Sequence, residues 1–151
     1  MDALFRLTAI EDIRVLKARY CRFVDNKDWA AFRALFADDA TLFFPENYNE
    51  PASINDFMPG VDVALAGSVT VHHIFAPEIE ILSEVSARGL WAMEDALYFP
   101  PDAEGFAGAS EIHGSGHYHE TYVRQGDRWL FQSIRLSRLR LDVRAKPRAV
   151  G

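Results

Sequence analysis

The first part of the chain has apolar residues at the spacing of a helix. One helical stripe takes in most of the large apolar positions: Ile10, Ile13, Leu16, Lys17, Tyr20, Phe23 and Val24. Thr8 and Glu11 have the spacing of a capping box, which predicts that the helix begins there. Asp25 lies on the flank of the stripe, so we expect a carboxylate at the margin of the core near the end of this helix.

A short polar segment, residues 25–28, separates this helix from a second one. Its last residue is an aspartate, which favours the N-cap position, and the second helix is predicted at about residues 29–36. A strand is expected to begin at Thr41. Residues 45–60 hold three of the seven prolines together with Asn and Glu, which predicts a loop or lid. Residues 62–68 are predicted to add one helical turn.

From Val69 onward the pattern changes to the two-residue alternation of strands. The predicted strands are residues 71–76, 78–82, 87–99, 111–124 and 129–141. Helices followed by several antiparallel strands predict an α+β fold in which the helices cover one face of the sheet. We therefore expect a single domain over residues 1–151, with a C-terminal tail over about 143–151.

The last predicted strand changes its apolar phase. Ile134 and Leu136 share one strand parity, whereas Leu139 and Leu141 share the other. Such a change is typical of a bulge or a bend, here near Ser137. Because bulges allow long strands to curl, the pattern predicts a curved sheet around a cavity rather than a flat one.

Length, composition and charge fit one globular domain. The chain has 151 residues, of which 49% are hydrophobic and 25% are charged. The net charge of −6 argues against nucleic-acid binding, which requires a basic surface. Six basic residues near the end are interpreted as a solvated strand edge and tail: Arg135, Arg138, Arg140, Arg144, Lys146 and Arg148.

The chain has a single cysteine, Cys21, so an internal disulfide is excluded and a reducing cytoplasm is expected. The helical pattern around Cys21, without a nearby Ser/His pair, favours a buried filler over a nucleophile. The N-terminus lacks the apolar segment of a leader, and no apolar run is long enough to span a bilayer. We therefore expect a cytoplasmic protein without a membrane partner.

His73 is the first candidate for acid/base chemistry. It follows His72 in an apolar strand, and neighbouring strand residues point to opposite faces, so one of the two histidines is expected inside. Imidazole, with an unperturbed pKa of about 6.5, suits proton transfer at neutral pH. The alternative is a hydrogen-bonded core histidine without a catalytic role.

Asp95 is the second candidate because it interrupts an apolar strand face. The odd positions of residues 89–99 are Gly, Trp, Met, Asp, Leu and Phe. A carboxylate in such a face is costly to bury unless it is paired or protonated. The opposite face carries Glu94, and one of the two acids is expected to be buried. The alternative to a catalytic Asp95 is a buried ion pair with an arginine.

His113, His117 and His119 share one strand parity, and the spacing of the last two allows two imidazoles to bind one metal ion. Without a convergent third ligand, histidines at solvent or at an interface are the favoured interpretation, so no metal site is predicted. The chain also has no phosphate-binding glycine loop, cysteine cluster or nucleophile elbow. We therefore expect chemistry that needs no cofactor.

Two stretches of the chain resemble the SnoaL-like proteins of the nuclear transport factor 2-like superfamily. The resemblance is carried by residues 10–13, Tyr20, residues 25–29 and 35–40, and later by His73 and residues 116–120 and 126–129. It spans most of residues 8–142. It implies a cone-shaped, curved antiparallel sheet with the N-terminal helices on its concave side, a fold also called cystatin-like.

Among enzymes of this family, the motifs resemble those of scytalone dehydratase. An Asp-x-Lys-Asp-Trp segment begins at Asp25, so the resemblance gives Asp25 the place of the catalytic aspartate and His73 that of the proton-shuttling histidine. Other active-site positions differ. Val24 and Phe44 stand in place of tyrosines, and Leu97 stands in place of a second histidine. Scytalone itself is therefore not the expected substrate.

The same register implies an apolar pocket that holds acid/base groups. Its lining is expected from Tyr20, Phe44, Met93, Leu97, Ile134 and Leu136, together with Asp95 and Tyr118. We hypothesise a cofactor-independent lyase (dehydratase) or an isomerase acting on a small apolar cyclic carbonyl or phenolic compound. In this hypothesis His73 moves a proton, and Asp25, with or without Asp95, orients its ring. Tyr118 donates a hydrogen bond to a developing oxyanion.

A non-catalytic protein that binds a small apolar ligand is the rival hypothesis, and the replaced tyrosines and histidine favour it. A His73 side chain within hydrogen-bond reach of a carboxylate in a cavity would support the enzyme. Divergence of the side chains of His73 and Asp25 would support the binder. We also expect a homodimer or homotrimer, because curled sheets of this kind usually bury their outer face against a partner.

Overall fold

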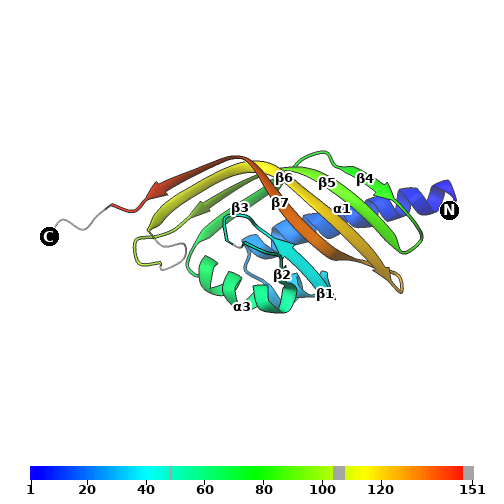
Figure 1. Cartoon of the computed structure of the whole chain (residues 1–151), viewed down its shortest axis with the longest axis horizontal. Helices are drawn as coiled ribbons and strands as arrows, with labels where there is room; N and C mark the ends of the chain where they lie inside the picture. The colour runs from blue at the N-terminus through cyan, green and yellow to red at the C-terminus, as the bar shows by residue number, and fades with distance from the viewer. Residues whose placement is uncertain (48, 104–107, 148–151) are drawn as a thin grey trace.

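The computed structural model describes residues 1–47, 49–103 and 108–147 and shows an α+β unit (Figure 1). The helices are α1 (Ala3–Asp25), α2 (Trp29–Arg33) and α3 (Ile54–Leu65). The strands are β1 (Phe36–Phe43), β2 (Ala52–Ser53), β3 (Val69–Ile74), β4 (Glu78–Ile81), β5 (Ser86–Tyr98), β6 (Ala109–Gln125) and β7 (Arg128–Ala145). Their order in the sheet is β2-β1-β7-β6-β5-β3, and β4 also pairs with β5.

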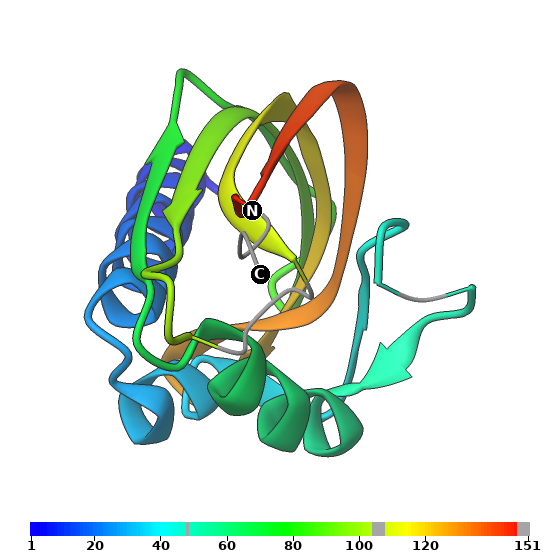
Figure 2. The same cartoon turned by 90° about the vertical axis from the view of Figure 1, so that its left-hand side faces the viewer.

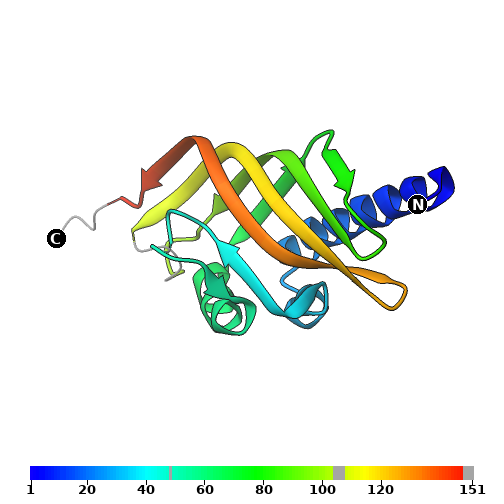
Figure 3. The same cartoon turned by 45° about the vertical axis from the view of Figure 1, so that its right-hand side comes forward.

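The sheet is strongly curved, and the helices lie against its inner side. Figure 2 looks along the molecule into the arch of the long strands, with α1 along one side and α3 across the bottom. In Figure 3, β6 and β7 cross the front of the molecule diagonally and α1 runs behind them. The described strand pairs are antiparallel, except that β1 runs parallel to β7. The predicted α+β cone is therefore confirmed.

Helix α1 begins earlier than the capping-box pattern predicts. Asp2 is its N-cap, and the Asp2 carboxylate accepts a hydrogen bond of 2.8 Å from the backbone N–H of Phe5. The prediction of a start at Thr8 is wrong because this earlier cap already satisfies the first turn. The buried face of α1 includes Ile13, Leu16 and Tyr20, as the apolar stripe predicts.

The end of α1 is set by its backbone. The N–H of Asp28 donates to the carbonyl of Phe23 at 2.9 Å, and the N–H of Lys27 donates to that of Val24 at 3.1 Å. This pair of bonds is a Schellman motif, and Lys27 accordingly has a φ of 56°. Asp25 is the last residue of the helix, so the chain turns away immediately after it and leaves its side chain at the helix end.

Two boundaries in the next segment differ from prediction. Helix α2 ends at Arg33 rather than Phe36, and β1 begins at Phe36 rather than Thr41. The cause is a long-range contact, because the first residue of β1, Phe36, lies opposite Phe131 near the start of β7. The strand propensity of the local sequence cannot indicate a pairing between residues so far apart in the chain.

The predicted loop or lid over residues 45–60 contains the first part of a helix. Most of α3 falls within residues 45–60, which the sequence assigns to a loop, and the predicted single turn at 62–68 is only its end. Ser53 caps α3 by accepting a hydrogen bond of 3.1 Å from the N–H of Asp56. The helix runs through Pro59, although the prolines of this segment predict a loop. Its buried residues Ile54 and Phe57 cover the open side of the arch.

The long strands follow the prediction closely and include the predicted bulge. Across the β6–β7 pairing, Gly116 lies opposite Arg138 while Ser115 lies opposite Arg140, so Leu139 is the extra residue. This is two residues from the predicted position near Ser137. Because of the bulge, the inward parity of β7 changes after Arg138. Strand β7 continues to Ala145, three residues into the predicted tail, and residues 148–151 of that tail lie outside the described residues.

The core contains an unpredicted buried ion pair beside its aromatic cluster. The Lys17 Nζ donates to Glu120 Oε1 at 2.5 Å, and both side chains are 0% exposed. Tyr122 donates its hydroxyl to the other oxygen of Glu120 at 2.5 Å, and Trp91 Nε1 donates to the Tyr122 oxygen at 2.9 Å. These bonds satisfy the buried polar groups, which would otherwise be costly inside an apolar core.

Within the described ranges, no helix is long and apolar enough to cross a bilayer.

Candidate active site

A cavity of about 650 Å³ lies between the helices and the inner face of the sheet, and we call it the inner cavity. Its walls are mainly apolar and include Val24, Phe32, Phe44, Phe57, Leu97 and Leu136. Beyond the bulge, Leu141 and Val143 continue the wall along β7. The few polar side chains in the lining are therefore the groups that can orient a bound molecule, and the volume is in the range of small-molecule sites.

His72 lines the inner cavity and is hydrogen-bonded to Asp25, the last residue of α1. The His72 Nδ1 lies 2.7 Å from Asp25 Oδ1, and the backbone N–H of His72 donates to Asp25 Oδ2 at 2.9 Å. The hydroxyl of Thr70 donates to Asp25 Oδ1 at 2.9 Å. An ionised carboxylate can only accept, so Nδ1 carries the proton and Nε2 is the ring nitrogen left for a bound molecule. The pair thus has the arrangement of an oriented general base.

These contacts also set the charge of Asp25. Burial opposes ionisation of this carboxyl, but the hydrogen bonds from the His72 ring, the His72 backbone and Thr70 outweigh burial. The pKa of Asp25 is consequently lowered below its usual value. Its place at the C-terminal end of α1, where the helix dipole disfavours an anion, makes these donors necessary.

The structure corrects the predicted position of the histidine. His73 has the opposite strand parity and lines a hollow on the outer face with Glu94, His113 and Arg140, whereas His72 lines the inner cavity. The side chains of His73 and Asp25 therefore diverge, because Asp25 bonds to His72. The geometry expected of an acid/base pair is nevertheless present one residue earlier, because His72 lines the inner cavity and its ring is hydrogen-bonded to the Asp25 carboxylate.

Asp95 is the buried one of the two acids, and it pairs with an arginine, which is the alternative to a catalytic role that the sequence leaves open. Arg138 donates from Nη1 to Asp95 Oδ1 at 2.7 Å and from Nη2 to Asp95 Oδ2 at 2.9 Å. The same guanidinium donates from Nε and Nη2 to Glu46 Oε1, at 2.8 and 2.6 Å. The interpretation of Arg138 as part of a solvated strand edge is wrong, because its side chain is 16% exposed and lines the inner cavity.

Gly114 provides the space for this cluster. A Cβ at Gly114 would lie 2.1 Å from Arg138 Nη1 and 2.6 Å from Asp95 Oδ1. The paired carboxylates raise the pKa of Arg138 even though burial opposes its charge, so the guanidinium remains a cation. The inner cavity therefore holds two charged clusters, one around His72 and one around Arg138.

Tyr20 and Tyr118 lie in the lining of the inner cavity, as the sequence predicts. Their rings are 5.9 Å apart and edge to face. Burial raises the pKa of both phenols well above the usual value, so both remain protonated donors. The ammonium of Lys17 lies 3.8 Å from the ring centre of Tyr20 and 3.5 Å from that of Tyr118.

The remaining predicted lining residues divide into two groups. Phe44, Leu97 and Leu136 line the inner cavity. Met93 and Ile134 do not line it and are buried in the core, at 2% and 1% exposure. Their strand parity is the inward one, but neighbouring side chains cover them.

The three histidines of β6 lie on its outward parity, away from the inner cavity. His119 lies 2.9 Å through Nε2 from the hydroxyl of Ser137, and burial, with Arg135 and His117 nearby, lowers its pKa. His113 stacks edge to face with Tyr98. In the part of the chain that the structure describes, no three His, Cys, Asp or Glu side chains are grouped so as to hold a metal ion.

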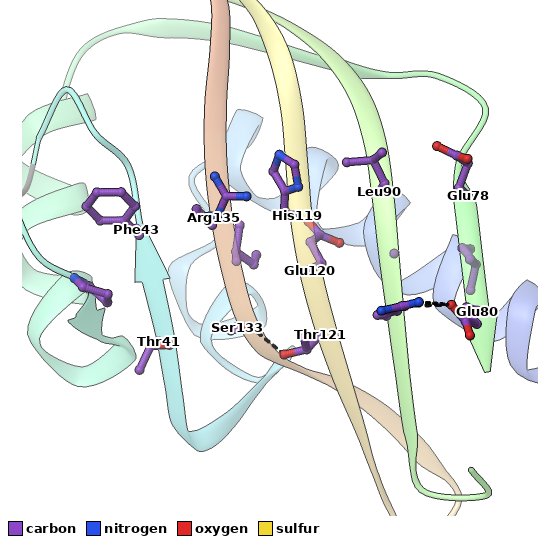
Figure 4. Close-up of a pocket in the computed structure, with 15 residues that line it drawn as sticks. Thr41, Phe43, Glu78, Glu80, Leu90, His119, Glu120, Thr121, Ser133 and Arg135 are labelled. Atoms are coloured by element: carbon purple, nitrogen blue, oxygen red, sulfur yellow. Dashed lines mark hydrogen bonds and ion pairs between the residues drawn. The ribbon is translucent and has the colours of Figure 1, made fainter. Parts of the chain in front are cut away.

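A second hollow, of about 830 Å³, lies over the outer face of the sheet, and we call it the outer groove. Figure 4 shows side chains around it from strands across the sheet, including Phe43, Leu90 and His119. Its polar contacts join neighbours across the strands: Thr121 lies 2.6 Å from Ser133, and Arg88 donates to Glu80 at 2.7 Å (Figure 4). It contains no counterpart of the His72–Asp25 pair, so the inner cavity is the better candidate for catalysis.

The arched sheet and the acid/base pair in an apolar hollow define a small α+β protein of the NTF2-like class. The profile of the SnoaL-like domain family matches residues 6–135, and the chain belongs to this family. It is 28% identical over 138 residues to the “Probable cyclase FGR4” of Gibberella zeae, covering 82% of this chain and 86% of that protein.

Solved structures show the same fold. A scytalone dehydratase-like protein from Novosphingobium aromaticivorans superposes with a TM-score of 0.79 at 17% identity, covering 99% of both chains. The hexachlorocyclohexane dehydrochlorinase LinA-type3 from Novosphingobium barchaimii superposes with a TM-score of 0.76 at 15% identity, again covering 99% of both. At such low identities the likeness establishes the fold alone.

Sequence reasoning missed two polar members of the site, Arg138 and Glu46. A signal existed for Arg138, because it shares the inward parity of Ile134 and Leu136 and precedes the bulge. Glu46 lies in the turn after β1, within the segment assigned to a lid, and nothing in its local sequence indicates that it reaches β7.

Proposed function

We propose that this protein is a cofactor-independent lyase or isomerase that acts on a small, largely apolar cyclic carbonyl or phenolic compound. General acid/base catalysis is carried out by His72, which takes the role that the sequence assigned to His73. The observation that carries the proposal is the 2.7 Å contact between Asp25 Oδ1 and Nδ1 of His72, a histidine that lines an apolar cavity.

In the proposed reaction, Nε2 of His72 removes a proton from a carbon next to the substrate carbonyl. The electrons of the C–H bond form a C=C bond, and the carbonyl electrons move to the oxygen, which becomes an enolate. Asp25 stabilises the resulting imidazolium and keeps its ring in place. In an isomerase, the imidazolium returns the proton to another carbon. In a dehydratase, the enolate expels hydroxide from the β-carbon, and the Nε2 proton leaves with it as water.

Tyr118 supplies a neutral hydrogen-bond donor for the developing oxygen anion. Its raised pKa keeps the hydroxyl protonated at any physiological pH. Asp95 has no direct role in orienting the histidine in this proposal, because its oxygens are taken by Arg138.

The relatives support a reaction of this type. FGR4 is named as a cyclase, and the structural neighbours include a scytalone dehydratase-like protein and a dehydrochlorinase. Dehydration and dehydrochlorination both remove a proton and a leaving group from neighbouring atoms, and this step suits a base in an apolar cavity.

The proposal is tested by hydrogen exchange in D₂O with a panel of cyclic ketones and phenols, followed by mass spectrometry. Enolisation incorporates deuterium next to the carbonyl even when no net reaction follows. His72→Asn and Asp25→Asn should each slow exchange by about 100-fold or more. His73→Asn is the matched control and should remain within about threefold of the wild type. Near-full exchange by the His72 variant would contradict the proposal.

A non-catalytic small-ligand binder is the second candidate. Val24, Phe44 and Leu97 line the cavity without offering a hydrogen bond, and this apolar wall suits binding as well as catalysis. The same experiment separates the two: a compound that binds in the inner cavity without faster exchange, across the whole panel, would favour the binder.

Self-association is also proposed, as a homodimer or homotrimer that buries the outer face of the sheet. The outer groove, with Phe43 and Leu90 at its surface, is the proposed contact. Sedimentation velocity of the full chain measures the stoichiometry, and a monomer at all concentrations would contradict the proposed self-association.

The cytoplasm remains the proposed compartment, because the single cysteine, Cys21, is free.

A further inference from the structure

The guanidinium of Arg138 presents two N–H groups to one oxygen atom. Its Nε and Nη2 both donate to Glu46 Oε1, at 2.8 and 2.6 Å. Two donors that converge on a single oxygen form the usual geometry of an oxyanion site. The adjacent edge of the guanidinium, formed by Nη1 and Nη2, is fixed by the two-bond contact with Asp95, so the converging edge has a defined direction.

Glu46 is the exchangeable partner of the two carboxylates. Asp95 uses both oxygens, comes from the middle of β5 and has a side chain that is 5% exposed. Glu46 contacts Arg138 through one oxygen, comes from the turn after β1 and has a side chain that is 22% exposed. Breaking the Glu46 contact therefore releases a carboxylate toward water, whereas breaking the Asp95 contact would strand a buried charge.

We infer that Glu46 occupies a subsite for an anionic oxygen of the substrate, and that a phenolate or enolate oxygen displaces it from Arg138. This inference rests on the proposed function and extends it by naming the group that holds the negative charge. Arg138, Glu46 and His72 all line the inner cavity, so one bound molecule has access to the base and to the guanidinium. Arg138 is then a catalytic residue, and Glu46 competes with the substrate oxygen for Nε and Nη2 of Arg138.

Charge balance favours an anionic oxygen over a neutral one. One guanidinium faces two carboxylates, so the cluster of Arg138, Asp95 and Glu46 carries a net negative charge. When a phenolate or enolate replaces Glu46, Arg138 remains paired with two anionic groups. Exchange of Glu46 for a neutral carbonyl gives up a charge-assisted hydrogen bond for a weaker one. Arg138 adds the positive charge that the neutral Tyr118 donor lacks.

The test is binding of 4-nitrophenol, whose ionised and neutral forms differ in absorption, compared with nitrobenzene as a neutral ligand of similar shape. Wild-type protein should bind the phenol in its ionised form at a pH where the free compound is mostly neutral. Glu46→Ala should tighten binding of the phenolate by about tenfold and change nitrobenzene binding by less than about twofold. Arg138→Met should bind the phenol without ionising it.

Matched variants separate this mechanism from a general change of charge. Glu50→Ala removes an exposed carboxylate from the same segment, and Arg140→Met removes an exposed arginine from the same strand; neither should change the phenolate preference. Unchanged phenolate affinity in Glu46→Ala, or an equal gain in Glu50→Ala, would overturn the inference. These two variants decide the matter even if Arg138→Met fails to fold.

One further variant keeps the inference apart from the proposed reaction. His72→Asn should lose deuterium exchange but still bind the phenolate, because Arg138 and not the histidine holds the oxygen. If the wild type ionises the bound phenol and yet exchanges no compound of the panel, the proposed reaction fails and the anion subsite stands. If exchange depends on His72 but the phenol stays neutral, the subsite fails and the reaction stands.

Discussion

Asp25 and His72 are joined by two hydrogen bonds, one to the imidazole ring and one to the backbone N–H of the same residue. The second bond, together with that from Thr70, does not depend on the ring. Replacing the imidazole therefore removes the base without releasing the carboxylate from its place at the end of α1. This makes substitutions of the ring a clean probe of chemistry, because the surrounding structure keeps two of its three donors.

The stability that Asp25 contributes should depend on pH. Its pKa in the folded protein lies below the usual 3.8, so its contribution is present above that value and is lost as the pH falls through the lower folded-state value. The difference in unfolding free energy between wild type and Asp25→Asn should be largest near neutral pH and shrink below about pH 4. Urea unfolding over a pH series measures it, with the exposed Asp12→Asn of the same helix as control. A difference independent of pH would contradict the ionised pair.

Removing one partner of the buried Lys17–Glu120 pair should lower the free energy of unfolding strongly, whereas replacing both partners with apolar residues should lower it less. Lys17→Met leaves the Glu120 charge in the core with only the Tyr122 hydroxyl, and we expect a loss of about 3–5 kcal/mol. Lys17→Met combined with Glu120→Leu should be more stable than Lys17→Met alone, since no unpaired charge remains. Urea unfolding of the two variants measures the difference, and a double variant less stable than the single one would contradict this account.

Two glycines of β6 should respond differently to alanine. A Cβ at Gly116 would lie 2.0 Å from the backbone oxygen of Ser137, so the β6–β7 contact at the bulge would have to open. A Cβ at Gly114 would meet Arg138 Nη1 and Asp95 Oδ1, which are side-chain atoms, so their ion pair would have to shift while the strand pairing stays closed. We expect Gly116→Ala to cost about 2–3 kcal/mol and Gly114→Ala less than this. Thermal unfolding gives the order, and a larger loss for Gly114→Ala would show that the pairing is misassigned.

Cys21 should be unreactive in the folded protein. Burial raises the pKa of its thiol to about 11, and the thiolate is the form that attacks thiol reagents. Native protein at pH 7 should react with Ellman's reagent far more slowly than protein unfolded in urea. Rapid reaction of the native protein would place Cys21 at the surface and contradict the packing of α1.

The sequence predicted the architecture because the architecture depends on long periodic segments. The apolar stripe of α1 and the alternation of β5 to β7 each extend over many residues, and the phase change near Ser137 predicted a bulge two residues from the one at Leu139. Helix α3 was missed because Pro59 and the surrounding polar residues indicate a loop. Its formation depends on burying Ile54 and Phe57 against the other elements, which a local pattern does not contain.

The site was predicted less well because pairs of residues distant in sequence decide it. Strand parity requires one of His72 and His73 to face inward but does not say which. The resemblance to scytalone dehydratase gave the role to His73, but Val69, which shares the parity of His73, is 63% exposed. The position of Asp25, fixed by the end of α1, decides the matter, and a register error of one residue reverses every side chain of a strand.

The central claim is that His72, held by Asp25, presents a bare Nε2 to the inner cavity. Nitrogen-15 NMR of the histidine rings tests it without a substrate, because the two ring nitrogens of a neutral imidazole have distinct shifts and report which one carries the proton. The account predicts that neutral His72 is the Nδ1–H tautomer, that Asp25→Asn abolishes this preference, and that His73 is unaffected. An Nε2–H tautomer at His72, or one that is insensitive to Asp25→Asn, would contradict it.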